Sequence, residues 1–104
     1  MNYHLVLCTC PNEKTAKKIA YALVTDKLAA CVNIVPGITS IYRWQETIET
    51  EIEVQLLIKS NNACFEQLTE KIHSFHPYTT PEIIALNIQQ GDKAYLNWIT
   101  ESLK

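Results

Sequence analysis

Glycine is scarce in this sequence, because only two glycines occur among 104 residues. Neither belongs to a glycine-rich phosphate-binding loop or to a Gly-x-Ser-x-Gly turn, so the common nucleotide-binding and hydrolase patterns are missing. Excess charge is also lacking, since nine Lys and Arg are scattered against eleven Asp and Glu. A footprint for nucleic acid or an anionic membrane is therefore not expected. These absences favour a binding protein over an enzyme.

Long hydrophobic runs and linkers are absent as well. No segment approaches the ~20 apolar residues of a membrane helix, and no Gly/Ser/Pro-rich tract divides the chain, so we expect one domain spanning residues 1–104. The first four residues show no basic region followed by an apolar signal core, which predicts a cytoplasmic protein. In that compartment the four cysteines are expected to be reduced thiols, core residues or ligands for soft metals.

The order of apolar patterns predicts an α+β fold. The clearest strand is 48–58, where even positions are apolar apart from Thr50 and the odd positions begin with three glutamates. The fold class that follows is a ferredoxin-like βαββαβ unit with an antiparallel sheet in the order 4-1-3-2, both crossover helices on one face and an extra C-terminal helix. We expect strands at residues 3–8, 30–34 continuing at 38–44, 48–58 and 83–88, and we expect the strand at 83–88 to be buried. We expect helices at residues 11–26, from 60–62 to 76, and from 91–92 onward. The C-terminal helix is expected to pack through Tyr95, Trp98 or Ile99, and Leu103.

A long hairpin, residues 38–58, is expected around the short connection 45–47. The preceding Val35-Pro36-Gly37 predicts a bulge or bend in the first of its strands. Apolar side chains run along the hairpin, and exposed strips of this kind usually mark an interface. The sequence therefore predicts a homo-oligomer built through the hairpin.

The predicted topology brings a polar, proline-bearing loop, residues 76–82, to the end of the first strand. Cys8 and Cys10 lie on one face of that strand, and His76 opens the loop, so two thiols and an imidazole are expected near one another, with Cys31 at the opposite end of the subunit. Thiolates select soft or borderline ions such as copper and zinc. The alternative is that both cysteines are buried small hydrophobes and that His76 only ends a helix.

Three further groups have two interpretations each. Glu49, Glu51 and Glu53 form either a cation-binding row or, as we expect, a solvated or intersubunit face. Tyr42, Arg43 and Trp44 either stack on or bind a ligand, or anchor an interface. The loop residues form either a small-molecule pocket against the first strand or a staple for the loop itself; these residues are Tyr78, Thr79, Thr80 and Glu82.

Several motifs together resemble the CutA divalent-cation tolerance family. The resemblance spans nearly the whole chain. The segments that carry it are Leu28-Ala29-Ala30-Cys31-Val32-Asn33-Ile34-Val35-Pro36-Gly37, Ile38-Thr39-Ser40-Ile41-Tyr42-Arg43-Trp44, Glu53-Val54-Gln55, His76-Pro77-Tyr78-Thr79-Thr80-Pro81-Glu82 and Tyr95-Leu96-Asn97-Trp98-Ile99.

The resemblance implies a homotrimer with packed hairpins, an architecture similar to the PII signalling proteins, and tolerance of heavy metals, copper above all. It also implies a metal site at Cys8 and His76. Some members carry a second His where this chain has Phe75, and we hypothesise that Cys10 replaces it as a soft ligand. Glu46 is a further departure, at a hairpin position where many members have glycine.

Two functions follow as hypotheses. The first is a cytoplasmic homotrimer that binds copper or another divalent cation. The alternative is a PII-like trimeric sensor that binds a small anionic ligand between subunits and acts on an unidentified protein partner. A third interpretation, an RNA-recognition module with the same element order, lacks the basic, aromatic sheet that such modules use.

Overall fold

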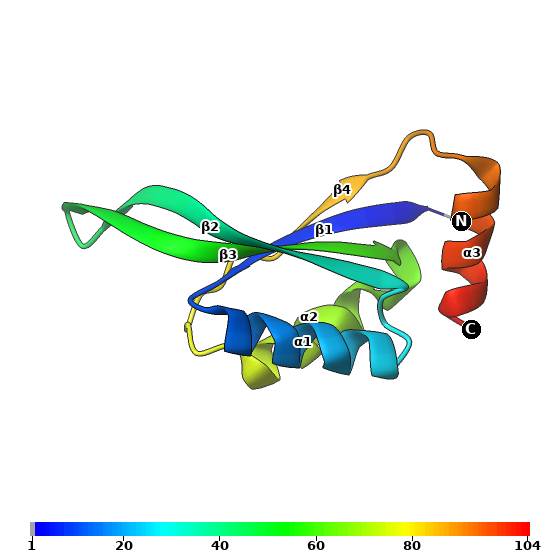
Figure 1. Cartoon of the computed structure of the whole chain (residues 1–104), viewed down its shortest axis with the longest axis horizontal. Helices are drawn as coiled ribbons and strands as arrows, with labels where there is room; N and C mark the ends of the chain where they lie inside the picture. Colours follow the sequence, from blue (N-terminus) through cyan, green and yellow to red (C-terminus); the bar gives the residue numbers. More distant parts are fainter. Residues whose placement is uncertain (1) are drawn as a thin grey trace.

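The computed structural model describes residues 2–104 as a four-stranded antiparallel sheet with two helices packed on one face (Figure 1). The strand order is β2-β3-β1-β4, which is the predicted order, so the ferredoxin-like α+β fold is confirmed. The elements are β1 Tyr3–Cys10, α1 Glu13–Thr25, β2 Cys31–Trp44, β3 Thr47–Asn61, a 3₁₀ turn Asn62–Cys64, α2 Phe65–Phe75, β4 Ile84–Asn87 and α3 Lys93–Ser102.

The core lies between the sheet and the helices α1 and α2. Residues at even positions of β1 and β3 point toward the helices, as the strand period requires. Asn12 caps α1 by accepting a 2.8 Å hydrogen bond from the Thr15 N–H, so Pro11 lies just before the helix and not in its first turn. The fully buried side chains of this layer include Val6, Cys8, Cys10, Ile19, Leu23, Leu56, Ile58, Leu68 and Ile72.

The β2–β3 hairpin closes through two residues, Gln45 and Glu46, and both have a positive φ, of 48° and 67°. That is the pattern of a type I′ turn, which suits the twist of antiparallel strands and normally uses Asn or Gly. The pairing register shifts between Val35 and Ile38, where Gly37 has a φ of 73°. The predicted bulge is therefore confirmed, and β2 continues through it as a single strand.

The outer half of the hairpin extends beyond the helices and gives the subunit its 45 Å long axis (Figure 1). On the side of the sheet that carries the helices, the apolar face of β3 continues into this outer half, where no helix of the chain covers it. Ile41, Ile48 and Ile52 are 70%, 58% and 66% exposed in the single chain. The sheet therefore has a covered half and a bare half made by the same two strands.

One expectation about packing was wrong, and a second was only partly confirmed. The strand β4 was expected to be buried, but it is a short edge strand of four exposed residues. Its apolar residues Ile84 and Leu86 pair with Leu7 and Leu5, which places them on the sheet face opposite the helices. In α3 only Ile99 is buried, whereas Tyr95 and Trp98 stack on each other at the surface. The helix is instead fastened to β1 by a 2.6 Å hydrogen bond between the Tyr3 and Thr100 hydroxyls. Among residues 2–104 no helix is long and apolar enough to span a membrane.

Candidate functional site

The loop that joins α2 to β4 passes around the end of β1. Its first residue, His76, caps α2, and its backbone N–H donates to the Ile72 carbonyl at 2.9 Å. Pro77 and Pro81 follow, and neither can donate to a helix or a strand ladder. The loop thus starts on the helix side of the sheet and delivers its next residues to the opposite side.

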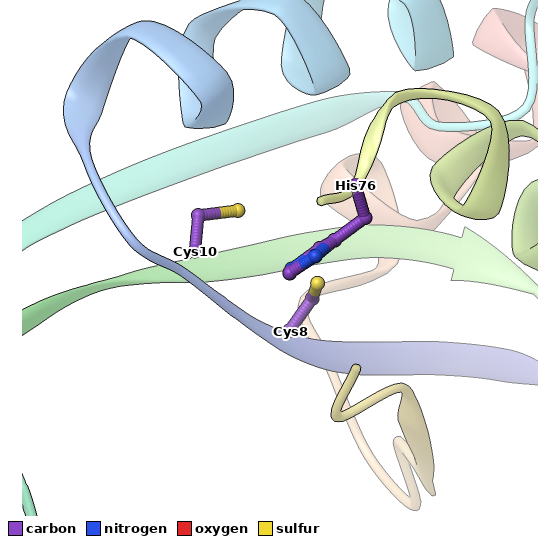
Figure 2. A group of neighbouring side chains, drawn as sticks. All are labelled: Cys8, Cys10 and His76. Atoms are coloured by element: carbon purple, nitrogen blue, oxygen red, sulfur yellow. The ribbon is translucent and has the colours of Figure 1, made fainter. Parts of the chain in front are cut away.

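Two thiols and an imidazole meet on the helix side, as the topology predicted. Cys8 and Cys10 project from β1, and His76 reaches toward them from the end of α2 (Figure 2). Their candidate ligand atoms all lie within 4.8 Å of one another, and all three side chains are buried. Cys8 and Cys10 are fully buried and His76 is 8% exposed, so both interpretations of the cysteines, core residues and soft ligands, are compatible with their burial.

Both ring nitrogens of His76 already have partners. The backbone N–H of Tyr78 donates to Nδ1 at 3.2 Å, and Nε2 lies 2.7 Å from the Thr9 carbonyl oxygen. Because a backbone N–H can only donate, Nδ1 is the acceptor, and the ring is a neutral imidazole with its proton on Nε2. The ring therefore pins the loop to β1, and it must release one of these hydrogen bonds before a nitrogen can bind a metal ion.

The two thiols differ in acidity. The neighbouring Cys10 side chain raises the pKa of the Cys8 thiol, and burial raises it further. The Cys8 side chain in turn lowers the pKa of Cys10. Cys10 is thus the first of the pair to ionise, and the thiolate is the form that binds metals.

The three side chains are of the types that bind soft metal ions, but the distances between their ligand atoms must shorten before they can hold one. Two sulfurs and one imidazole nitrogen are the ligands that copper(I) and zinc accept. Zinc bonds of about 2.3 Å to sulfur and about 2.0 Å to nitrogen place ligand atoms less than about 4 Å apart, so the 4.8 Å cluster must contract slightly. Loss of the two thiol protons is the further requirement.

A cleft of about 810 Å³ lies on the opposite side of the sheet and extends from the end of β1 along the projecting hairpin. Thr9, between the two cysteines, faces it. The strand period places the two sites on opposite faces of β1, one residue apart in sequence. The cleft is lined by Thr9, Ser40, Ile41, Tyr42, Trp44, Glu49, Glu51, Glu53, Tyr78, Thr79, Thr80 and Glu82.

Carboxylates and aromatic rings dominate this lining, which includes no Lys, Arg or His. Tyr78 donates its hydroxyl to Glu53 Oε2 at 2.9 Å, and Tyr42 donates to Glu51. Burial and the hydrogen bond to Glu53 raise the pKa of Tyr78, and the hydrogen bond to Glu51 raises the pKa of Tyr42 to about 12. Both hydroxyls therefore remain protonated donors near neutral pH.

Glu53 departs from the sequence-based expectation of a solvated glutamate row, because it is only 6% exposed. The five residues named in advance as ligand or interface positions, Tyr42, Trp44, Tyr78, Thr79 and Glu82, all belong to the lining, and Arg43 does not. Sequence reasoning missed Thr9, Ser40 and Ile41. Two features of the sequence could have placed residues on this side of the sheet. Thr9 is at an odd position of β1, and the bulge in β2 shifts its register so that Ser40 pairs with Glu51.

The chain matches the family model described as CutA1 divalent ion tolerance protein over residues 4–102. It is 51% identical over 98 residues to the divalent-cation tolerance protein CutA of Thermus thermophilus, covering 94% of this chain and 95% of the relative. A solved structure of the Thermus thermophilus protein superposes with a TM-score of 0.96 at 49% identity, covering 98% and 99% of the two chains. CutA from Xylella fastidiosa gives 0.97 at 40% identity over the full length of both.

Proposed function

Since the chain belongs to the CutA1 divalent ion tolerance protein family, we propose that it binds copper, or another soft or borderline divalent ion, through Cys8, Cys10 and His76. The family model and the Thermus thermophilus relative are described as divalent-cation tolerance proteins, and the role that we propose is binding without a catalysed step. We further propose that it acts in the cytoplasm as a homotrimer. The four free thiols support a reducing compartment.

The observation that carries the metal site is the convergence of three soft donors within 4.8 Å. Among residues 2–104 no other group of three or more His, Cys, Asp and Glu side chains comes together closely enough to hold an ion. Cys10 stands beside Cys8 and so supplies a third donor where Phe75 replaces the second histidine of some members. Cys8, Cys10 and His76 would hold the ion, and their burial would exclude water from it.

Metal uptake also has a consequence for the loop. His76 must free one ring nitrogen, and its present partners are the Thr9 carbonyl and the Tyr78 N–H. Releasing either partner loosens the attachment of the loop to β1. Occupancy of the thiol–imidazole cluster is thereby linked to the position of residues that line the acidic cleft, since both Thr9 and Tyr78 belong to that lining.

The bare half of the hairpin supports self-association. Ile41, Ile48 and Ile52 present large apolar surface on the uncovered helix-side face. On the opposite face, Ile84 and Leu86 of the edge strand are also half exposed. Exposed apolar surface on this scale is typical of subunit contacts. The number three rests on the family's likeness to the PII signalling proteins.

Native mass spectrometry of the reduced protein with and without copper tests subunit count and metal uptake together. We expect trimers that take up one copper ion per chain. Removing a ligand should weaken binding at least as much as the ~10–100-fold loss usual for second-shell changes. That loss is expected in Cys8→Ser, Cys10→Ser and His76→Ala. The matched control is Cys64→Ser, which alters a thiol at the start of α2 outside the cluster.

Three outcomes would separate the parts of this proposal. Equal copper uptake by Cys8→Ser and the wild type would overturn the site. Unchanged uptake by Cys10→Ser alone would reduce the site to Cys8 and His76. A monomer at every concentration would remove the homotrimer. The alternative function, a small anionic ligand, is disfavoured in this chain's own cleft, because four carboxylates and no cationic side chain line it.

A further inference from the structure

We propose that the backbone N–H of Tyr78 competes with the metal ion for His76, so that loading of the thiol–imidazole cluster always frees the backbone of residues 77–83. This competition presupposes the metal site proposed above and identifies which hydrogen bond must break when that site is loaded. The bond concerned runs from the Tyr78 N–H to Nδ1 of His76, at 3.2 Å.

The neutral ring of His76 has a single nitrogen lone pair to offer. Nδ1 holds that lone pair, because it accepts from the Tyr78 N–H, and Nε2 carries the proton that it donates to the Thr9 carbonyl at 2.7 Å. A metal ion binds a ring nitrogen through its lone pair. An ion at Nδ1 therefore takes the electron pair that the Tyr78 N–H uses, and that hydrogen bond is lost.

Coordination through Nε2 of His76 has the same result. The Nε2 proton must then leave, and in a neutral ring it moves to Nδ1. Nδ1 becomes a donor that faces a second donor, the Tyr78 N–H, and the two cannot form a hydrogen bond. Turning the ring over would place a carbon atom at the position of Nδ1. Every arrangement that frees a ring nitrogen of His76 thus deprives the Tyr78 N–H of this acceptor.

The surroundings of His76 keep the ring from moving together with Tyr78. The residue is only 8% exposed, and its ring centroid lies 4.8 Å from that of Tyr78. Its backbone N–H is held at the end of α2 by the Ile72 carbonyl, at 2.9 Å. Residue 76 therefore stays with the helix, and the adjustment falls on the residues that follow it.

The segment that adjusts is bounded on both sides. At its start His76 is fixed to α2, and at its end Ile84 pairs with Leu7 in the ladder between β1 and β4. Between these anchors lie residues 77–83, which include two prolines that have no N–H to donate. The Tyr78 N–H is thus an attachment whose loss loosens the backbone of this segment.

The side chain of Tyr78 does not take part in the competition. Its hydroxyl donates to Glu53 Oε2 at 2.9 Å on the opposite face of the sheet, and this contact involves neither ring nitrogen of His76. A part-buried donor is costly without an acceptor, so the released N–H must turn toward water. Loading therefore turns the Tyr78 backbone while its side chain stays anchored, and the change reaches Thr79, Thr80 and Glu82, which line the cleft.

The competition also lowers the metal affinity, because linked equilibria act in both directions. A chain without the Tyr78 N–H should bind a metal ion more tightly. Tyr78→Pro removes the N–H, and Tyr78→Ala is the matched control, since it removes the same ring and hydroxyl but keeps the N–H. We expect zinc to bind Tyr78→Pro roughly two- to tenfold more tightly than Tyr78→Ala, the range that corresponds to one hydrogen bond.

Hydrogen exchange measured by NMR follows the release directly, with zinc as a diamagnetic borderline ion. In the reduced, metal-free wild type we expect a protected Tyr78 amide. Zinc at saturation should speed its exchange at least about tenfold. The His76 amide is the internal control, because it donates to the Ile72 carbonyl in both states. Without metal, His76→Ala should speed exchange of the Tyr78 amide to a similar degree, since the acceptor is then missing.

Two results would overturn the competition and leave the metal site standing. One is zinc that shifts the Cys8 and Cys10 resonances while the Tyr78 amide stays protected. The other is equal zinc affinity in Tyr78→Pro and Tyr78→Ala. If zinc leaves the resonances of both cysteines unchanged, the metal site itself is removed, and the competition with it. The exchange measurement uses the wild type, so it decides the question even if Tyr78→Pro does not fold.

Discussion

The two faces of the sheet, where β1 pairs with β3, carry opposite chemistry. Cys8, Cys10 and Leu56 point under the helices into a dry, apolar layer. Thr9 and Glu53, from the same two strands, point into an open cleft of carboxylates and aromatic rings. The strand period of two is enough to separate a soft, buried donor set from a hard, acidic one.

Two residues of one loop join these faces. His76 lies on the sulfur side, and Tyr78 donates its backbone N–H to His76 while its hydroxyl reaches Glu53 on the acidic side. The two sites are thus built by one loop whose backbone crosses the sheet edge. A substitution that acts on one face and spares the other tests how independent they are.

Leu56→Ala should have the largest effect on stability of the variants considered. Leu56 is fully buried beneath the helices, and such truncations cost about 2–5 kcal/mol of unfolding free energy. Ile52→Ala changes the same face of β3 beyond the helices, where the single chain leaves Ile52 exposed. We expect its effect to appear chiefly in subunit association, as an unfolding midpoint that depends more strongly on protein concentration.

Urea unfolding of both variants over a range of protein concentrations makes this measurement. The comparison between the covered and bare halves of β3 fails if Ile52→Ala, like Leu56→Ala, destabilises the protein equally at every concentration. It is sharpened if only Ile52→Ala dissociates the oligomer, because Ile52 then belongs to the subunit contact.

Tyr78→Phe should have an intermediate effect confined to the acidic face. The variant removes the hydroxyl that donates to the buried Glu53, which costs about 1–3 kcal/mol when a buried polar partner is left unsatisfied. It keeps the backbone N–H that holds His76, so metal binding by the thiol–imidazole cluster should not change. Thermal unfolding and metal titration of the same sample measure both quantities.

A matched loss of metal affinity in Tyr78→Phe would contradict this expectation, because the link between the two faces would then run through the Tyr78 hydroxyl as well as through its backbone N–H. Thr79→Val serves as the control. It removes another hydroxyl of the cleft lining, but the hydrogen bond to Glu53 comes from Tyr78 and not from Thr79. It should leave both stability and metal affinity close to those of the wild type.

Local patterns predicted the elements well where one face of an element is covered. The alternation of β3, the apolar stripe of α2 and the Cys8–Cys10–His76 convergence all follow from periodicity combined with the topology. They succeed because a strand or helix that packs on a core must place its apolar residues at its own period. Ile88 and Ile83 were expected in the last strand by the same logic, but β4 is shorter.

The exposure of residues that do not face α1 and α2 could not be predicted from local patterns. The apolar residues of β4 and α3 look like core residues in sequence, yet all of them except Ile99 are at least partly exposed in the single chain. Glu53 shows the reverse error, because the loop from the far end of α2 buries a glutamate that its strand pattern marks as solvated. The hydrogen bonds of His76 likewise depend on the path of that loop, which no local pattern encodes.

The smallest expected effect concerns Tyr42, on the open part of the acidic face. The hydrogen bond to Glu51 raises the pKa of Tyr42 to about 12, from an ordinary value near 10. Because the folded pKa is the higher one, the stabilisation is fully present below pH 10 and is lost as the pH rises through about 12.

Ultraviolet titration of tyrosinate, taken as the difference between wild type and Tyr42→Phe, should show this late transition. In Glu51→Gln the transition should move back toward pH 10, because the remaining amide oxygen carries no charge. A Tyr42 that ionises near pH 10 in the wild type would mean that the exposed carboxylates of the cleft do not act on its hydroxyl, and the acidic face would then be organised only around the buried Glu53.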